Sequence, residues 1–304
     1  MRASGMCREI WYPLGYPLQI ETESPAVLAT CRDAWGHWPK LFDVQPLRLR
    51  VWVRGGAAAI RPQFFVERGV AAYVADKDNC GGFRTGGRLA WLRVSEQTAL
   101  KYVEFRYHFL EALVLTLLDT VAFTPIHAAC ITRANRAVLL CGDSGAGKSS
   151  LAYLAATRGW TFVSDDAVHV RQGGTGGLVG NPFKLHLRAE AKSLFPELAC
   201  MVPRSVPNGK RAIEIATAPL STNVQCGRVA ACVFLRRRPG RTRILPHSAH
   251  SALKYFSRYA WWRRERPPIS EFQSVLTSGC WSLEYESGET ALSALGHLLD
   301  GTAA

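Results

Sequence analysis

The sequence predicts an α/β fold for residues 95–304 and a smaller, mainly antiparallel β domain for residues 1–94. The segment 142–149 reads Gly-Asp-Ser-Gly-Ala-Gly-Lys-Ser, which fits the spacing G-x-x-x-x-G-K-[ST]. The apolar run 137–141 precedes this segment as a buried strand does, and helix-forming residues 150–156 follow it. Before residue 95, short apolar runs alternate with Gly, Pro and Asp, which is typical of hairpins.

Length and charge limit the class of protein. The chain has 304 residues, enough for about two domains with buried cores, and a formal net charge of +13. Arginines concentrate at 236–243 and 258–266, which favours anionic partners, although each cluster alone is slightly more typical of a solvated loop or helix face. The longest apolar stretch, 109–123, contains Glu111 and Asp119, so no membrane span is expected.

The cysteines indicate a reducing compartment. Nine cysteines are spread singly, without a C-x-x-C pair or a grouping with histidine that would suggest a metal site. The N-terminal residues lack the apolar core of a signal peptide. We therefore expect a cytoplasmic protein.

In the N-terminal part, period-two patches at 63–66 and 70–74 predict a hairpin that turns at 67–69, and 58–60 and 89–94 are further candidate strands. Ser95 is a candidate cap for a mostly buried helix that runs to about residue 123. No chemical motif occurs before this helix.

The position of a histidine just before the glycine-rich segment changes the interpretation of that histidine. His127 lies near the start of the apolar strand 124–131, where a single histidine is more often a satisfied core residue. If this strand pairs antiparallel with 137–141 through a turn at 133–136, His127 comes towards the glycine-rich end of the sheet.

The glycine-rich segment has the chemistry of a phosphate-binding loop. Its glycines let backbone N–H groups turn towards phosphate oxygens, and the following helix adds free N–H donors and the positive end of its dipole. Lys148 is expected to reach the β- and γ-phosphates, and Ser149 to place its hydroxyl on Mg²⁺. The expected nucleotide-binding residues are Gly142, Asp143, Ser144, Gly145, Ala146, Gly147, Lys148, Ser149 and Ser150.

Two adjacent carboxylates follow the next predicted strand. Residues 160–164 form an apolar strand that runs into Asp165 and Asp166. Ligands in α/β sheets lie beyond the carboxyl ends of the strands, so these carboxylates are expected to face the γ-phosphate and its metal. The alternative is an acidic turn without a function.

The rest of the chain predicts further elements without a motif of their own. We expect a hairpin from 167–170 and 178–179, a short helix at 190–198, strands at 212–215 and 228–235, a helix at 248–264 and a final strand and helix at 281–299. The segment 202–209 is a candidate mobile loop that leads into Lys210 and Arg211.

Together these motifs resemble the HPr kinase/phosphorylase family. The matching segments are Ile126 to Ala129, Gly142 to Ser149, and Val163 to Val168 with its Asp-Asp pair. The resemblance covers about residues 120–235 and is closest to shorter HPr-kinase-like proteins such as lasso peptide kinases. The segment 180–184 occupies the place of the family's glutamate signature, which leaves a third metal ligand and a phosphorylase activity open.

The resemblance implies a core like that of phosphoenolpyruvate carboxykinase, with ATP and Mg²⁺ as cofactors. It implies Asp165 as the base for an acceptor hydroxyl and His127 lying against the Asp165 carboxylate. Asp166 and Ser149 would hold Mg²⁺, and Lys148 with Lys210 or Arg211 would balance the charge of the transferred group.

The expected activity is ATP-dependent transfer of the γ-phosphoryl group to a hydroxyl group of an acidic peptide or protein. Serine is the expected acceptor residue. A small-molecule kinase and a nucleotide-binding regulator without transfer activity stay open. A nucleic-acid-dependent ATPase has only the charge in its favour, since the basic clusters lack regularly interleaved aromatic residues, so nucleic acid is not an expected partner. The oligomeric state is open.

Overall fold

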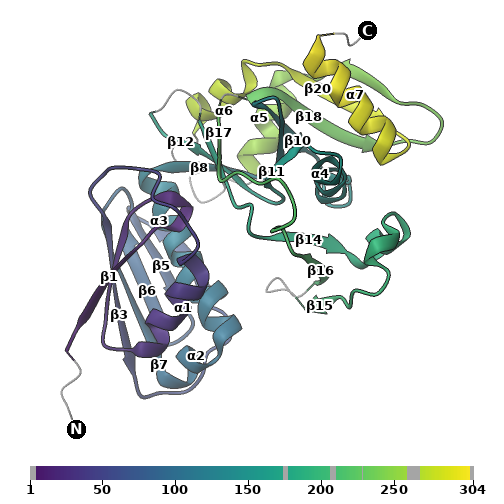
Figure 1. Cartoon of the computed structure of the whole chain (residues 1–304). Coiled ribbons are helices and arrows are strands. Elements are labelled where there is room, and N and C mark those ends of the chain that lie inside the picture. The colour runs from purple at the N-terminus through teal and green to yellow at the C-terminus, as the bar shows by residue number, and fades with distance from the viewer. Residues whose placement is uncertain (1–4, 174–176, 206–209, 228, 259–267, 302–304) are drawn as a thin grey trace. The chain divides into compact units, whose positions relative to one another are not determined.

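The structure is a computed structural model that describes residues 5–173, 177–205, 210–227, 229–258 and 268–301. It divides into two compact units, Met1–Ala122 and Phe123–Ala304 (Figure 1). The sequence had suggested a boundary between residues 94 and 95. The division falls later because the helices after residue 95 pack on the first sheet, where the Tyr73 hydroxyl donates to the Ala112 carbonyl at 3.1 Å.

The first unit contains one seven-stranded sheet. Its strands β2 and β3, and β3 and β7, pair parallel, whereas the other neighbours pair antiparallel. The predicted hairpin around 67–69 is present, but residues 58–60 form no strand. In spatial order the strands are β1 (Cys7–Trp11), β2 (Leu18–Thr22), β3 (Leu47–Arg54), β7 (Leu89–Ser95), β6 (Cys80–Arg84), β5 (Val70–Val74) and β4 (Gln63–Glu67).

The helices of the first unit include a segmented version of the predicted long helix. The Ser95 side chain caps α2 by accepting a hydrogen bond from the Thr98 N–H at 3.0 Å, as expected. The helix is interrupted at Lys101, whose ψ of 83° is not helical. The helical segments are η1 (Pro13–Gly15), α1 (Pro25–Trp35), α2 (Glu96–Leu100), the π-type η2 (Glu104–Glu111) and α3 (Ala112–Val121).

The second unit is built on a six-stranded sheet. Strands β10, β18 and β20 are parallel, and β9 pairs antiparallel with β10 as the sequence predicted. Since β11 and β10 are both antiparallel to β9, they run in the same direction and end at the same edge of the sheet. The order is β11 (Thr161–Ser164), β9 (Ala129–Arg133), β10 (Arg136–Cys141), β18 (Val229–Arg237), β20 (Cys280–Tyr285) and β19 (Arg243–Pro246).

Both faces of this sheet are buried, which explains its nearly continuous apolar strands. The side chains on the same face of the sheet as Leu140 pack against α4 (Lys148–Thr157) and α7 (Gly288–Asp300). The side chains on the same face as Leu139 pack against α5 (Ala249–Arg258) and α6 (Ile269–Leu276). The sequence analysis had not predicted α6. Residues of a four-stranded sheet also contribute to the core on the Leu139 face. The strand order of this sheet is β17 (Gln225–Cys226), β13 (Leu178–Gly180), β12 (Val168–Arg171) and β8 (Phe123–Ile126).

A three-stranded sheet completes the second unit: β14 (Leu185–Arg188), β16 (Arg211–Ile215) and β15 (Arg204–Ser205). The predicted helix at 190–198 is two 3₁₀ helices, η3 (Ala189–Ser193) and η4 (Pro196–Leu198), because Pro196 cannot continue the first one. Parts of two other predictions, 206–209 of the proposed mobile loop and 259–266 of the second basic cluster, lie outside the described residues.

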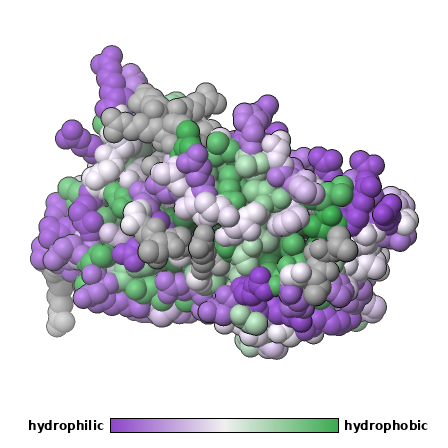
Figure 2. Space-filling model, turned by 90° about the horizontal axis from the view of Figure 1, so that it is seen from above, coloured by the Kyte–Doolittle hydropathy of each residue, from purple (hydrophilic) through white to green (hydrophobic). Residues whose placement is uncertain are grey.

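In the described part of the chain, no helix is long and apolar enough to cross a membrane. On the face shown in Figure 2, hydrophilic residues predominate towards both margins, and hydrophobic residues are scattered between them.

Candidate functional site

The glycine-rich loop connects β10 to α4 and has a backbone that glycine alone adopts easily. Gly142, Gly145 and Gly147 have φ values of +139°, +93° and +96°. At Gly147 a Cβ atom would lie 2.1 Å from the Tyr285 hydroxyl oxygen. The strand, glycine loop and helix predicted from the sequence are therefore present, and the loop conformation depends on these glycines.

Two tyrosines hold the loop at its two ends. Tyr255 of α5 donates its hydroxyl proton to the Gly142 carbonyl at 2.8 Å and accepts from the Gly142 N–H at 3.1 Å. Tyr285 of β20 donates to the Ala146 carbonyl at 2.7 Å. Both side chains are buried, so their hydroxyl groups occupy fixed positions. The loop is thus positioned before any ligand binds.

Lys148 lies inside the loop. Its ammonium donates to the carbonyls of Gly142 at 2.7 Å and Asp143 at 3.4 Å, and the residue is only 8% exposed. Burial lowers the pKa of Lys148 from its ordinary value. The first turn of α4 adds backbone N–H groups without intrahelical partners. A buried cation and free N–H donors in one place favour an anion.

The two aspartates after β11 have different environments. Asp165 is 7% exposed; its Oδ1 accepts from the Ser149 hydroxyl at 3.3 Å and its Oδ2 from the His186 N–H at 2.6 Å. Burial raises the pKa of Asp165 to about 7, although the His186 N–H opposes this change. The Asp166 side chain is 84% exposed, and its Oδ1 lies 3.3 Å from His127 Nδ1.

This arrangement corrects part of the sequence-based interpretation. We had expected His127 against Asp165 and Asp166 beside Ser149, but the carboxylate next to His127 Nδ1 is that of Asp166, and the Ser149 hydroxyl donates to Asp165. Strand β11 ends at Ser164, and the two aspartates lie in the bend that follows, where one side chain is buried and the other exposed. Burial and the nearby Lys148 ammonium lower the pKa of His127, which keeps its ring neutral near pH 7.

One cavity of about 530 Å³ brings most of the predicted site residues together. Lys210 lines it, as expected. Arg211 does not; it points instead to the Pro203 carbonyl and donates to it at 3.1 Å. The lining residues are His127, Ser144, Gly145, Gly147, Lys148, Ser149, Ser150, Asp165, Asp166, His186, Arg188, Glu190, Ala191, Ser193, Leu194, Lys210 and Arg237.

Three of the loop positions that we expected to bind nucleotide do not line this cavity. Gly142, Asp143 and Ala146 line a neighbouring cavity instead, and the Asp143 carboxylate lies 3.7 Å from the Arg258 guanidinium. Ser144 accepts a hydrogen bond from Arg188 at 2.6 Å.

Sequence reasoning missed three residues of the site with basic side chains: His186, Arg188 and Arg237. His186 and Arg188 alternate with the buried Leu185 and Leu187 along β14, so their side chains share one face. This period-two pattern was a usable signal. Arg237 ends the buried strand β18, and the run of arginines around it concealed which one faces the loop.

The donor set suits Mg²⁺ and a phosphate ligand. Hydroxyl and carboxylate oxygens are ligands that Mg²⁺ prefers, and this ion usually takes few protein ligands beside water and substrate phosphates. Ser149 and Asp165 supply such oxygens next to the Lys148 ammonium. Among the described residues, no group of three or more His, Cys, Asp or Glu side chains forms a larger metal site.

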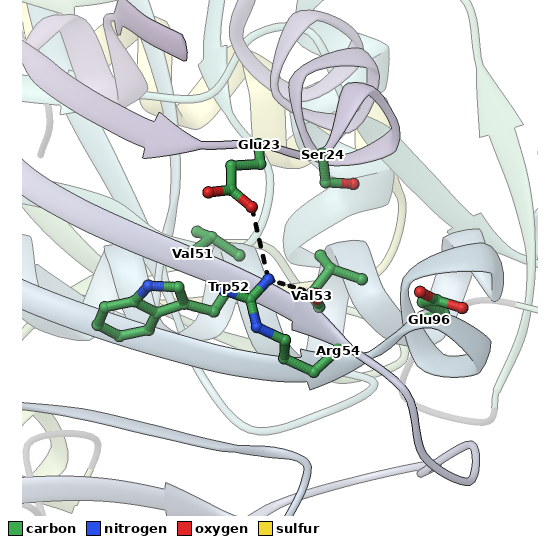
Figure 3. A pocket seen from close by; sticks show the side chains of 7 residues that line it. All are labelled: Glu23, Ser24, Val51, Trp52, Val53, Arg54 and Glu96. Atoms are coloured by element: carbon green, nitrogen blue, oxygen red, sulfur yellow. Dashed lines mark hydrogen bonds and ion pairs between the residues drawn. The ribbon is translucent and has the colours of Figure 1, made fainter. Parts of the chain in front are cut away.

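A cavity of about 260 Å³ in the first unit offers less chemistry (Figure 3). Arg54 and Glu23 form an ion pair across it at 3.5 Å, and Arg54 also donates to the Val53 carbonyl. Trp52, Ser24, Val51 and Glu96 complete its lining. Its cation is already paired, and it contains neither a glycine-rich loop nor a buried carboxylate.

Comparison with known proteins gives a distant structural likeness. No family model matches the chain, and no curated protein matches it. Among solved structures, the HPr(Ser) kinase/phosphatase from Coxiella burnetii is similar over 59% of this chain and 89% of its own length. The two share 12% sequence identity with a TM-score of 0.33, which is too distant to assign an activity.

Proposed function

We propose that the chain is an ATP-dependent kinase that transfers the γ-phosphoryl group to a hydroxyl, with serine of a peptide or protein as the expected acceptor. The observation that carries this proposal is a single cavity containing the Lys148 and Ser149 end of a phosphate-binding loop, a buried Asp165, and Asp166 paired with His127. Phosphoryl transfer requires a loop that binds phosphate, oxygen ligands for a metal ion, and a separate base for the acceptor hydroxyl.

The nucleotide phosphates are assigned to the loop and the first turn of α4. Backbone N–H groups and the Lys148 ammonium would bind the β- and γ-phosphate oxygens. Ser149 and Asp165 would hold Mg²⁺, which would neutralise charge on the phosphates. The hydrogen bond between these two side chains already sets their oxygens side by side.

The acceptor is assigned to the side of the cavity that carries Asp166. In this assignment the Asp166 carboxylate accepts the proton of the acceptor hydroxyl as the hydroxyl oxygen attacks the γ-phosphorus, and the bond from the γ-phosphorus to the β–γ bridging oxygen breaks so that ADP leaves. The neutral His127 ring donates from Nδ1 to the Asp166 carboxylate and fixes its orientation. Asp166 therefore takes the role that the sequence had suggested for Asp165, because it is the exposed carboxylate and the Ser149 hydroxyl bonds to Asp165 instead.

The charge around the cavity favours an acidic acceptor. Lys148, Arg188, Lys210 and Arg237 line it, and in the transition state such cations stabilise negative charge on the transferred group. A positive cavity also increases the rate at which acidic substrates reach it.

The test is a comparison of wild-type protein with Lys148→Ala, using ATP labelled on the γ-phosphate and the peptide products of neighbouring genes as acceptors. We expect labelled phosphoserine with wild type and none with the variant. If the wild type shows no nucleotide binding by calorimetry at millimolar MgATP, the kinase proposal fails. Labelling of a small metabolite instead of a peptide would identify a small-molecule kinase.

A further inference from the structure

A small apolar slot lies beside the phosphate cavity. It has a volume of about 210 Å³, below the range of about 300–1,000 Å³ that is usual for a whole drug-sized ligand. It is therefore sized for one part of a larger molecule. Its lining residues are Gly147, Ser150, Leu151, Leu154, Leu194, Phe195, Arg237, Tyr285, Ser287, Gly288 and Glu289.

The slot is continuous with the phosphate cavity. Gly147, Ser150, Leu194 and Arg237 line both, so a ligand with its phosphates at Lys148 reaches the slot along the first turn of α4. Asp165, Asp166 and His127 line only the phosphate cavity. In phosphoryl transfer the attacking and leaving oxygens lie roughly in line, on opposite sides of the transferred phosphorus. If the acceptor binds at Asp166, the rest of the nucleotide therefore lies on the side of the phosphorus away from Asp166.

The chemistry of the slot suits a planar heterocycle. Its walls are aliphatic or aromatic, and four of them, Leu151, Leu154, Phe195 and Tyr285, are at most 8% exposed. The polar side chains that line it, besides the Tyr285 hydroxyl, are few: Ser150, Arg237, Ser287 and Glu289. Mostly apolar walls with a few polar groups are typical of a site that binds a ring and selects it by hydrogen bonds.

The other cavity beside the loop suits a different ligand. It is larger, about 780 Å³, and Arg236, Arg237, Arg238 and Arg258 line it. Four guanidinium groups with one lining carboxylate, Asp143, favour an anion over a neutral ring.

We infer that the apolar slot is the subsite for the base of the nucleoside triphosphate, with Leu194 as a wall residue that contacts the base. This inference rests on the proposed function. Leu194 suits a test because it is 46% exposed and its truncation leaves the buried core intact.

The test measures binding of two probes, MgATP and Mg-tripolyphosphate, which carries the phosphates without a base. Calorimetry is done on wild type, Leu194→Ala and the control Arg236→Ala, a surface residue of the arginine-lined cavity. We expect Leu194→Ala to weaken MgATP about fivefold and to leave tripolyphosphate unchanged. Arg236→Ala should change neither affinity by more than about twofold.

Three results would overturn the inference while leaving the phosphate site in place. They are equal weakening of both probes by Leu194→Ala, no weakening of either, and a selective loss of MgATP affinity in Arg236→Ala. A wild type that binds tripolyphosphate as tightly as ATP would likewise exclude a base subsite. If the wild type binds neither probe, the proposed function fails together with the inference.

Discussion

Replacing each adjacent aspartate by asparagine separates the two roles assigned to them. In Asp166→Asn the shape is kept and the carboxylate that faces His127 is lost. We expect turnover to fall by about 10²–10⁴-fold, which corresponds to about 3–5 kcal/mol of barrier. Binding of MgATP should stay within about twofold, because the Ser149 hydroxyl bonds to Asp165 and not to Asp166, and a mostly exposed charge is well screened.

Asp165→Asn should have the opposite pattern. Its side chain can still accept from the His186 N–H, but it loses the negative charge assigned to the metal. The affinity for nucleotide should therefore stop depending on Mg²⁺. Turnover should also fall, because the metal is lost from the site.

Asp165→Asn should also stabilise the ligand-free protein. A carboxyl whose pKa is about 7 in the folded state and 3.8 in its ordinary state binds more protons when folded, so folding loses stability as pH rises between these values. The upper limit of this loss is about 4 kcal/mol at neutral pH. We expect a rise in Tm of a few degrees at pH 8 without Mg²⁺. Asp166→Asn should leave Tm unchanged.

The assays need no knowledge of the physiological acceptor. Phosphate release from ATP, with water as the acceptor, measures turnover, and calorimetry with and without Mg²⁺ measures binding. If Asp165→Asn keeps Mg²⁺-dependent binding and Asp166→Asn loses it, the assignment is reversed. If both variants keep wild-type turnover, the pair is an acidic turn without a catalytic role.

Further predictions concern the loop and its charges. Lys148→Ala should lower ATP hydrolysis by at least about 10²-fold, measured as phosphate release, because the cation inside the loop is lost. Gly147→Ala should abolish ATP binding by calorimetry, since its Cβ would meet the Tyr285 hydroxyl and φ is +96°. Tyr255→Phe removes a buried hydroxyl from the loop and should weaken ATP binding about three- to tenfold in the same assay. Raising salt should weaken acceptor binding more than ATP hydrolysis, which steady-state kinetics at two ionic strengths will measure. A fully salt-independent KM for the acceptor, or variants that bind ATP like wild type, would contradict these expectations.

The sequence was most informative where a local pattern determines local structure. The strand, loop and helix around 137–157, the hairpin of β9 and β10 and the hairpin of β12 and β13 follow from apolar runs and turn residues that are neighbours in the chain. Each needs only contacts over a few residues, so its signal is contained in one segment.

Features that depend on distant segments could not be predicted in the same way. The parallel pairing of β3 with β7 joins residues about forty positions apart, and the later unit boundary depends on helices that pack back on that sheet. The tyrosines that hold the loop come from α5 and β20, more than a hundred residues after Gly142. An apolar position that contains tyrosine does not indicate which carbonyl its hydroxyl will reach.

The orientation of the two aspartates shows why even adjacent residues can be assigned wrongly. A half-buried strand would reveal its inward face by alternating apolar and polar residues. Strand β11 is covered on both sides, with Phe162 in one core cluster and Val163 in the other, so no such alternation exists. In addition, the register of β11 with β9 shifts between Phe162 and Ser164. The face on which Asp165 lies therefore cannot be obtained by counting alternate residues along the strand. Which carboxylate meets Ser149 is therefore set by the bulge and by the His186 N–H of a separate sheet, neither of which has a signal in residues 160–166.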